Sequence, residues 1–343
     1  MIKFLFFSLF HFIVNKFFLK INFLVDKKET SDHKKKIIND LKTPLSGGFI
    51  FIIFFLFVLF EDNYSFLISV ILLYALGLMS DLNLLTSPIK RIIIQIFLIL
   101  SFIIINDLSI KTLSLELFDE LLNYKFFNIF FLLFCLLVLI NGFNFLDGIN
   151  TLVVSNFIIC LFSIYYLSNK YQLSLDFILI QNLLIILSVI FIFNFFGKSF
   201  LGDSGTYTIS FVIGILCIGF IYNNYPVVSP YFIACLLWYP ALENLFSILR
   251  RFFFKKKLSK ADNNHLHHFL YLVIKKNNFI KNNLFLNTFT GIIINSYIFL
   301  SIFTATFYYN HTKTLLMIIL FNVFLYFSLY YYLYRLLELK KKN

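Results

Sequence analysis

Long apolar segments, separated by short polar stretches, constrain this chain more than any other feature. A helix needs about 20 predominantly apolar residues to cross the hydrocarbon core of a bilayer. Segments of roughly this kind span 4–25, 46–61, 64–80, 89–105, 126–143, 151–168, 174–194, 206–222, 230–249, 285–308 and 314–336. With 60% hydrophobic and only 13% charged residues, the composition is typical of the same class. The sequence predicts an all-α, polytopic integral membrane protein with about eleven transmembrane helices.

Two of these segments depart from a regular span. Asn15, Lys16 and Lys20 interrupt the first, and we expect their side chains to snorkel or to face a neighbouring helix. Pro240 lies inside the ninth segment, where we expect it to kink or break the helix.

The distribution of lysine and arginine predicts the orientation of the chain. With the N-terminus in the periplasm, the inner segments hold 22 of the 29 basic residues and the outer ones hold five. This bias satisfies the positive-inside rule and places the C-terminus in the cytoplasm. The net charge of +12 then reflects loops beside anionic lipid, and we expect no nucleic-acid partner. The four cysteines lie in apolar runs, so we expect neither a disulfide framework nor a zinc site.

Every unusual polar stretch falls at the predicted cytoplasmic ends of the helices. We expect a single transmembrane domain over residues 1–343, with active-site loops near 26–48, 80–91, 141–150, 194–207 and 250–284. The most informative motif is Gly-Asp-Ser-Gly at 202–205. A charge at a membrane helix end needs solvent, a partner or a metal, and Asp203 on a glycine bend could present its carboxylate to Mg²⁺. A polar turn between two helices is the alternative for this motif alone.

Carboxylates and amides end two other apolar segments. Asp81 ends the third, where it would act as a general base or support another site residue; a plain helix-end charge is the alternative. Asn141, Asn144 and Asp147 recur every three residues and would line one face of a helical turn. Such a stripe can bind a nucleobase edge or the water shell of an ion, or it can simply cap the helix.

Two basic segments are suited to phosphate. One contains Lys34–Lys36 and then Lys42, followed by Thr43-Pro44 and by Gly47-Gly48. The glycines let a helix begin close to a neighbour or ligand, whereas the lysine run alone can also be a merely positive loop.

The largest inner segment carries His265, His267 and His268. Metal binding by these residues lacks support, because cysteine partners and a His-Glu-x-x-His pattern are absent. Imidazoles next to basic residues also suit a diphosphate or sugar hydroxyls. Upstream, Glu243 lies inside the ninth span, and two interpretations stay open: a structural pairing with Arg250, or a direct catalytic role.

Together these stretches resemble the family of polyprenyl-phosphate N-acetylhexosamine-1-phosphate transferases, which includes undecaprenyl-phosphate GlcNAc-1-phosphate and phospho-MurNAc-pentapeptide transferases. The resemblance covers nearly the whole chain, from Thr43–Gly48 to His265–His268, and the histidine loop resembles the GlcNAc-type branch. It implies transfer of an N-acetylhexosamine-1-phosphate from a UDP-sugar to undecaprenyl phosphate, with release of UMP. It also implies Mg²⁺ as cofactor, with Mn²⁺ as a substitute.

The implied setting is a multi-pass protein of the bacterial inner membrane whose active site faces the cytoplasm. There it would initiate a cell-surface polysaccharide such as O-antigen or another lipopolysaccharide glycan. The sequence leaves open the donor sugar and the oligomeric state, for which a homodimer is one option.

The resemblance also assigns roles to single residues. Asp203 matches the magnesium-binding aspartate, and Asp81 matches the second member of an Asp-Asp pair near the lipid phosphate. Asn144 and Asp147 match an Asn-x-x-Asp-Gly signature linked with the nucleotide and with catalysis. The implied catalytic residues are thus Asp81, Asp147 and Asp203. The implied substrate-binding residues are Lys42, Asn141, Asn144, Asn150, His265, His267 and His268.

Three positions depart from the family pattern. Ser80 replaces the first aspartate of the pair, Asn150 replaces the aspartate usual after Asp147-Gly148, and Asn263 stands where many members carry arginine. Serine and asparagine can form hydrogen bonds but cannot act as bases, so altered donor contacts and reduced activity are both open. Because the three matched aspartates remain, we expect an active enzyme.

Two mechanisms are open for this reaction, and two other function classes compete with the transferase interpretation. We expect direct in-line attack by the lipid phosphate, with Asp81 placing or deprotonating it; a phospho-aspartate on Asp203 is the rival route. A transporter or flippase for a lipid-linked or anionic substrate is the second function class, although it would need polar residues near the bilayer midplane. A catalytically inactive member that acts as an assembly subunit is the third.

Overall fold

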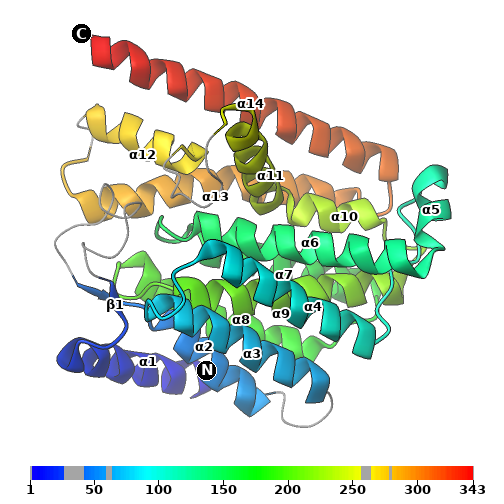
Figure 1. Ribbon diagram of the computed structural model, residues 1–343, viewed down its shortest axis with the longest axis horizontal. Helices are drawn as coiled ribbons and strands as arrows, with labels where there is room; N and C mark the ends of the chain where they lie inside the picture. The colour runs from blue at the N-terminus through cyan, green and yellow to red at the C-terminus, as the bar shows by residue number, and fades with distance from the viewer. Residues whose placement is uncertain (1, 27–41, 59–63, 256–263, 278–279, 343) are drawn as a thin grey trace.

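The computed structural model describes residues 2–26, 42–58, 64–255, 264–277 and 280–342. Most of these residues lie in helices (Figure 1). In chain order the helices are α1 (Ile2–Ile21), α2 (Gly47–Val58), α3 (Tyr64–Asp81), α4 (Pro88–Ile105), α5 (Glu116–Leu122), α6 (Lys125–Leu146), α7 (Leu152–Tyr171), α8 (Phe177–Phe195), α9 (Gly202–Asn224), α10 (Pro230–Leu236), α11 (Trp238–Phe253), α12 (Leu266–Lys276), α13 (Asn283–Phe307) and α14 (Thr312–Lys342). Two short strands, β1 (Val25–Asp26) and β2 (Thr43–Pro44), pair antiparallel.

The polytopic helical architecture is confirmed, but the number of spans differs from the eleven expected. Among the described residues, nine helices are long and apolar enough to cross a membrane, or ten if α10 and α11 form one bent span. Helix α2 accounts for the rest of the difference, since its 12 residues extend only about 18 Å at a rise of about 1.5 Å each. This length falls short of a hydrocarbon core about 30 Å thick.

The break expected at Pro240 is present. Helix α10 ends at Leu236 and α11 begins at Trp238, with an angle of 73° between them. Pro240 therefore lies in the first turn of α11, where a missing backbone N–H costs no helical hydrogen bond. After the bend, α11 packs against α6, and a Cβ on Gly142 of α6 would lie 2.3 Å from the Pro240 carbonyl oxygen.

Helix α9 is the most buried of the candidate spans and packs against α2, α3 and α6. Glycines allow these backbones to approach closely. A Cβ on Gly77 of α3 would lie 2.4 Å from the Cα of Ser204, and a Cβ on Gly48 of α2 would lie 2.5 Å from the backbone nitrogen of Gly205. Small residues at helix crossings are the usual means of packing in lipid, where apolar burial gives little drive. The expected close approach at Gly47-Gly48 is thereby confirmed.

Helices α1 and α14 form opposite outer faces of the bundle, at the bottom and top of Figure 1. The polar residues of α1 divide between its two sides. Asn15 is buried and accepts a hydrogen bond from Ser46, the residue before α2, so it faces a neighbour as expected. Lys16 and Lys20 are exposed on the outer side.

Successive helices run in opposite directions, which places the loops that carry Asp81, Asp147 and Asp203 at one end of the bundle. The C-terminal ends of α3, α6 and α8 lie beside the N-terminal ends of α4, α7 and α9, whereas α5 lies at the opposite end (Figure 1). The expected phosphate-binding run Lys34–Lys36 and the departure at Asn263 lie outside the described residues.

Candidate active site

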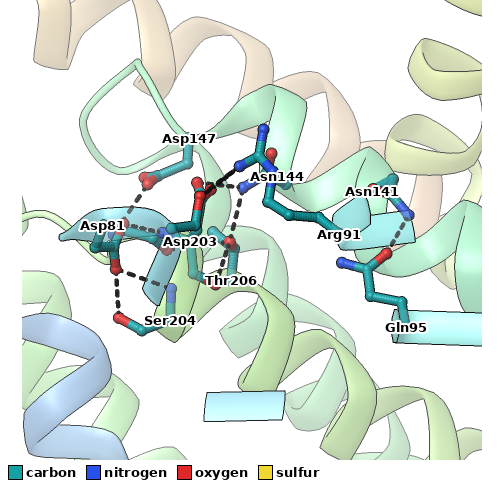
Figure 2. Close-up of polar contacts among 11 residues, drawn as sticks. Asp81, Arg91, Gln95, Asn141, Asn144, Asp147, Asp203, Ser204 and Thr206 are labelled. Carbon is teal, nitrogen blue, oxygen red and sulfur yellow. Dashed lines mark hydrogen bonds and ion pairs between the residues drawn. The ribbon is translucent and has the colours of Figure 1, made fainter. Parts of the chain in front are cut away.

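Asp203 lies in the first turn of α9, and its carboxylate is held by one side chain from each of three other helices (Figure 2). The Asn144 amide of α6 donates to Oδ1 at 2.8 Å. The Ser80 hydroxyl of α3 donates to Oδ2 at 2.6 Å, and the Arg91 guanidinium of α4 forms an ion pair with the same oxygen. One Arg91 nitrogen also donates to Ser80 Oγ. Asp203 therefore joins the ends of α3, α4 and α6.

Asp81, the last residue of α3, caps the start of α9. Its Oδ1 accepts a hydrogen bond from the backbone N–H of Asp203 at 2.8 Å. Its Oδ2 accepts from the backbone N–H of Ser204 at 3.0 Å and from the Ser204 hydroxyl at 2.7 Å. The first N–H groups of a helix have no partner within it, and a carboxylate there is favoured by the helix dipole. Asp81 thus stabilises the turn that carries Asp203.

Asp147 completes the ring of carboxylates around this turn. It lies directly after α6, and its Oδ2 accepts a hydrogen bond from the backbone N–H of Gly202 at 3.1 Å. Gly202 has a φ of +72°, and a Cβ at this position would lie 2.6 Å from Asp81 Oδ2. Only glycine meets both demands. The structure therefore brings together the three aspartates expected to be catalytic; their chemical roles stay predictions.

The expected stripe of Asn141, Asn144 and Asp147 does not form a single face. Asn144 contacts Asp203 and Thr206, whereas the Asn141 amide donates to Gln95 of α4 at 3.0 Å (Figure 2). A step of three residues rotates the side chain about the helix axis enough to face a different neighbour. Asp147 has left the helix altogether, because α6 ends at the residue before it.

Asn150, expected to bind substrate, is a buried bridge to α13. Its backbone N–H donates to the Asn287 side chain at 2.6 Å, and its amide donates to the Thr288 hydroxyl at 3.1 Å. The Thr288 hydroxyl in turn donates to the Phe195 carbonyl oxygen. These contacts tie the loop after α6 to α8 and α13. They explain why an amide, which can donate, stands at this position.

The three expected histidines form one cluster at the start of α12. The ring centroids of His267 and His268 lie 4.3 Å apart, and that of His265 lies 5.3 Å from His267. His265 Nδ1 lies 2.9 Å from Oε1 of Glu243, a fully buried residue of α11. Glu243 thus pairs with His265 and not with Arg250, whose guanidinium contacts the Asn264 carbonyl and the Tyr330 hydroxyl.

His267 is fully buried, and neither ring nitrogen has a hydrogen-bond partner among the described residues. Burial, with His268 and His265 nearby, lowers its pKa well below the ordinary value, so the ring is neutral at neutral pH. The cluster borders the aspartate loop, since a Cβ on Gly148 would lie 4.0 Å from His268 Nε2. Lys42, the remaining expected ligand, is exposed directly before β2.

The donor set fits a divalent cation bound mainly by substrate and water. In the part of the chain that the structure describes, no group of three or more His, Cys, Asp or Glu side chains is arranged to hold a metal. Mg²⁺, however, is commonly held by one or two carboxylates together with substrate phosphates and water. Asp203 lies in the first turn of α9, and Asp147 accepts a hydrogen bond from Gly202 at the start of that turn. Both carboxylates can therefore supply those oxygens. Among the described residues, Asp81 and Asp147 accept hydrogen bonds from the same turn, and Arg91 pairs with Asp203.

Arg91 is one of two site residues that sequence reasoning missed. It lies one turn into α4, after the Ser87 cap and Pro88. A basic residue inside an apolar segment is costly unless it is paired, and that cost is a signal from which its role could have been suspected. Thr206, which accepts a hydrogen bond from Asn144, was missed as well. A threonine within an apolar helix gives no comparable signal.

Comparison with known proteins gives a family match for the central part of the chain. Residues 63–221 match the family model described as glycosyl transferase family 4. The matched range holds Asp81, Arg91, Asn144, Asp147 and Asp203, whereas the histidine cluster lies beyond it. No curated protein matches the chain.

Proposed function

We propose that this chain, whose residues 63–221 match the model of glycosyl transferase family 4, transfers a sugar-1-phosphate to a polyprenyl phosphate. The donor in this proposal is a UDP-N-acetylhexosamine, the acceptor is undecaprenyl phosphate and the released nucleotide is UMP. The reaction would initiate a bacterial cell-surface glycan of the O-antigen or lipopolysaccharide type. The observation that carries the proposal is the convergence of Asp81, Asp147 and Asp203 on the first turn of α9.

The location of this turn suits a lipid acceptor. It lies at one end of a bundle with nine or ten candidate spans among its described residues. A polyisoprenoid chain can stay in the bilayer there while its phosphate reaches the helix end. The excess of lysine and arginine in the loops at this end supports a cytoplasmic site in an inner membrane, with α1 beginning on the periplasmic side.

The proposed step is a substitution at phosphorus. An oxygen of undecaprenyl phosphate attacks the sugar-bearing phosphorus of the UDP-sugar, the bond from this phosphorus to the bridging oxygen breaks, and UMP leaves with that oxygen. Asp203 and Asp147 would hold Mg²⁺, which neutralises diphosphate charge when bound. Asp81 fixes the position of Asp203 through two backbone hydrogen bonds of α9 and, in this proposal, places the lipid phosphate.

The histidine cluster and Lys42 complete the proposed substrate contacts. The cluster borders the loop of Asp147, so it can contact the sugar or the diphosphate. Lys42 precedes β2, whose Pro44 carbonyl accepts a hydrogen bond from Phe200 in the loop before α9. An exposed ammonium at that place can reach phosphate without being buried.

The test is UMP release by purified protein supplied with undecaprenyl phosphate, Mg²⁺ and a panel of UDP-N-acetylhexosamines. We expect release that depends on the lipid, with a preference for one donor. Asp203→Asn should lower the rate by roughly 100-fold or more, the scale seen when a charge-stabilising group is removed. Asp107→Asn is the matched control, because Asp107 is an exposed aspartate paired with Lys125 near α5. Folded protein that releases no UMP from any donor would contradict the proposal and favour an inactive assembly subunit or a transporter.

A further inference from the structure

Arg91 is the basic side chain that contacts Asp203 in the described structure. Its guanidinium forms an ion pair with Asp203 Oδ2, and the two side chains are only 21% and 25% exposed. The same guanidinium nitrogen donates to Ser80 Oγ, which itself donates to Asp203 Oδ2. Arg91, Ser80 and Asp203 therefore form a closed triangle in a site largely shielded from water.

The guanidinium is incompletely satisfied in this arrangement. Arg91 Nε is buried and has no hydrogen-bond partner among the described residues. Arginine can form two parallel hydrogen bonds with a carboxylate or phosphate, whereas here the ion pair uses one nitrogen on one oxygen. A buried donor without a partner favours a second anion beside the guanidinium.

The contact also occupies the carboxylate that a metal would need. Both Asp203 oxygens are engaged, Oδ1 by Asn144 and Oδ2 by Ser80 and Arg91. Asp81 offers no substitute, since both of its oxygens accept hydrogen bonds from the start of α9. A divalent cation that binds Asp203 must therefore compete with the Arg91 guanidinium.

We propose that Arg91 is the resident counter-ion of Asp203, and that it releases Asp203 to a divalent cation by moving onto a phosphate of the incoming substrate. The competition between Arg91 and a cation follows from the contacts of these residues alone. The transfer of Arg91 to phosphate rests on the proposed function. The exchange keeps charge balanced at each stage, because Asp203 always has a cation and Arg91 always has an anion.

The first part is tested by titrating Mn²⁺ into the substrate-free protein and following free Mn²⁺ by electron paramagnetic resonance. Arg91→Gln should bind Mn²⁺ with a dissociation constant roughly tenfold lower than the wild type, since it removes the competitor. Lys90→Gln is the matched control, because it removes the same charge from the neighbouring, exposed residue and should leave the constant unchanged. Adding Asp203→Asn to Arg91→Gln should abolish the gain.

An Arg91→Gln protein that binds Mn²⁺ no more tightly than the wild type would overturn the proposal, as would a gain that survives Asp203→Asn. If Arg91→Gln does not fold, Arg91→Met takes its place. Methionine keeps a long unbranched side chain and removes the charge, so Mn²⁺ should again bind more tightly, and an unchanged constant would count against the proposal.

The second part is tested by UDP binding to the folded protein in EDTA, measured by calorimetry. We expect Arg91→Gln to weaken UDP binding by roughly tenfold and Lys90→Gln to leave it unchanged. Equal UDP affinity in wild type and Arg91→Gln would overturn the transfer to phosphate. If the wild type binds no UDP either in EDTA or in Mg²⁺, the proposed function fails, and the Mn²⁺ result still decides whether Arg91 competes with a cation.

Discussion

The Asp81 carboxylate accepts hydrogen bonds from both the backbone N–H and the side-chain hydroxyl of Ser204, a residue far away in the sequence. A third bond, from the N–H of Asp203, engages its other oxygen. One side chain of α3 thus satisfies the otherwise unpaired start of α9 and fixes the turn on which Asp203 lies. The position of the central carboxylate depends on this contact between two helices.

Asp81→Asn should destabilise the protein and abolish its activity. The amide nitrogen of asparagine cannot accept a hydrogen bond, so part of the cap is lost at a cost of about 1–3 kcal/mol. Thermal unfolding in detergent and UMP release measure the two effects. Asp176→Asn is the control, because Asp176 caps the far end of α8 by accepting from Leu179 N–H. The carbonyl oxygen of asparagine can keep this one bond, so Asp176→Asn should change neither stability nor activity appreciably; full activity in Asp81→Asn would contradict the role given to the cap.

Gly77→Ala should separate α3 from α9. A Cβ there would lie 2.4 to 2.6 Å from backbone atoms of Ser204 and Asp203, which cannot move away as a flexible side chain can. We expect a lower unfolding temperature and loss of UMP release, because Asp81 would no longer reach α9. Gly219→Ala, also in a membrane helix, is the matched control, since nothing lies within 4 Å of its Cβ. Equal unfolding temperatures and equal rates of UMP release in the two variants would rule out the close crossing of α3 and α9.

Asn150→Asp restores the carboxylate that the family resemblance led us to expect, and it should be harmful here. The Thr288 hydroxyl donates to the Phe195 carbonyl, so it must accept its other hydrogen bond from residue 150. The carboxylate of an ionised aspartate has no proton to donate. A buried charge without a partner costs at least about 1–3 kcal/mol. Thermal unfolding should show this loss, whereas Asn123→Asp, an exposed change, should stay within about 0.5 kcal/mol. A more stable or more active Asn150→Asp protein would refute this reading of the bridge.

Stability should fall in mild acid because of His267. Burial, and then His268 and His265, hold its pKa well below the ordinary value of 6.5, to which the unfolded chain returns. The unfolded state therefore binds a proton that the folded state refuses, and stability decreases as pH drops below about 6.5, by up to about 1.4 kcal/mol per pH unit.

His267→Phe tests this dependence, since it keeps a buried ring and removes the titration. His265, His268 and the Glu243 carboxylate remain beside it and are common to both proteins. We expect the unfolding temperature of the variant to change less between pH 6.5 and 5 than that of the wild type. Parallel curves would show that His267 does not titrate on unfolding.

Much of this arrangement could be predicted from residue patterns because each pattern has a local cause. Long apolar runs require helices, Pro240 favours a new helix start and so a break in the ninth apolar segment, and Gly48 permits close contact with a neighbour. The grouping of Asp81, Asp147 and Asp203 follows from antiparallel helices that share one end. None of these predictions needed knowledge of which helices touch.

The remaining features depend on pairings between helices, which the sequence does not specify. The contact of Asn141 with Gln95 and that of Asn150 with Thr288 depend on how α4 and α13 are placed. The ion pair of Arg91 with Asp203 is of the same kind. Among the described residues the candidate spans number nine or ten and not eleven, because α2 is short there and length was not weighed beside apolar composition.

The most direct test of the central claim is the identity of the lipid product. Protein incubated with undecaprenyl phosphate, Mg²⁺ and the preferred UDP-sugar is extracted, and the lipids are analysed by mass spectrometry. The account predicts undecaprenyl diphosphate bearing one sugar in the wild type and in Asp107→Asn, formed roughly 100-fold or more slowly in Asp203→Asn. The same rate of product formation in Asp203→Asn, or no lipid-linked sugar diphosphate in the folded wild type, would contradict it.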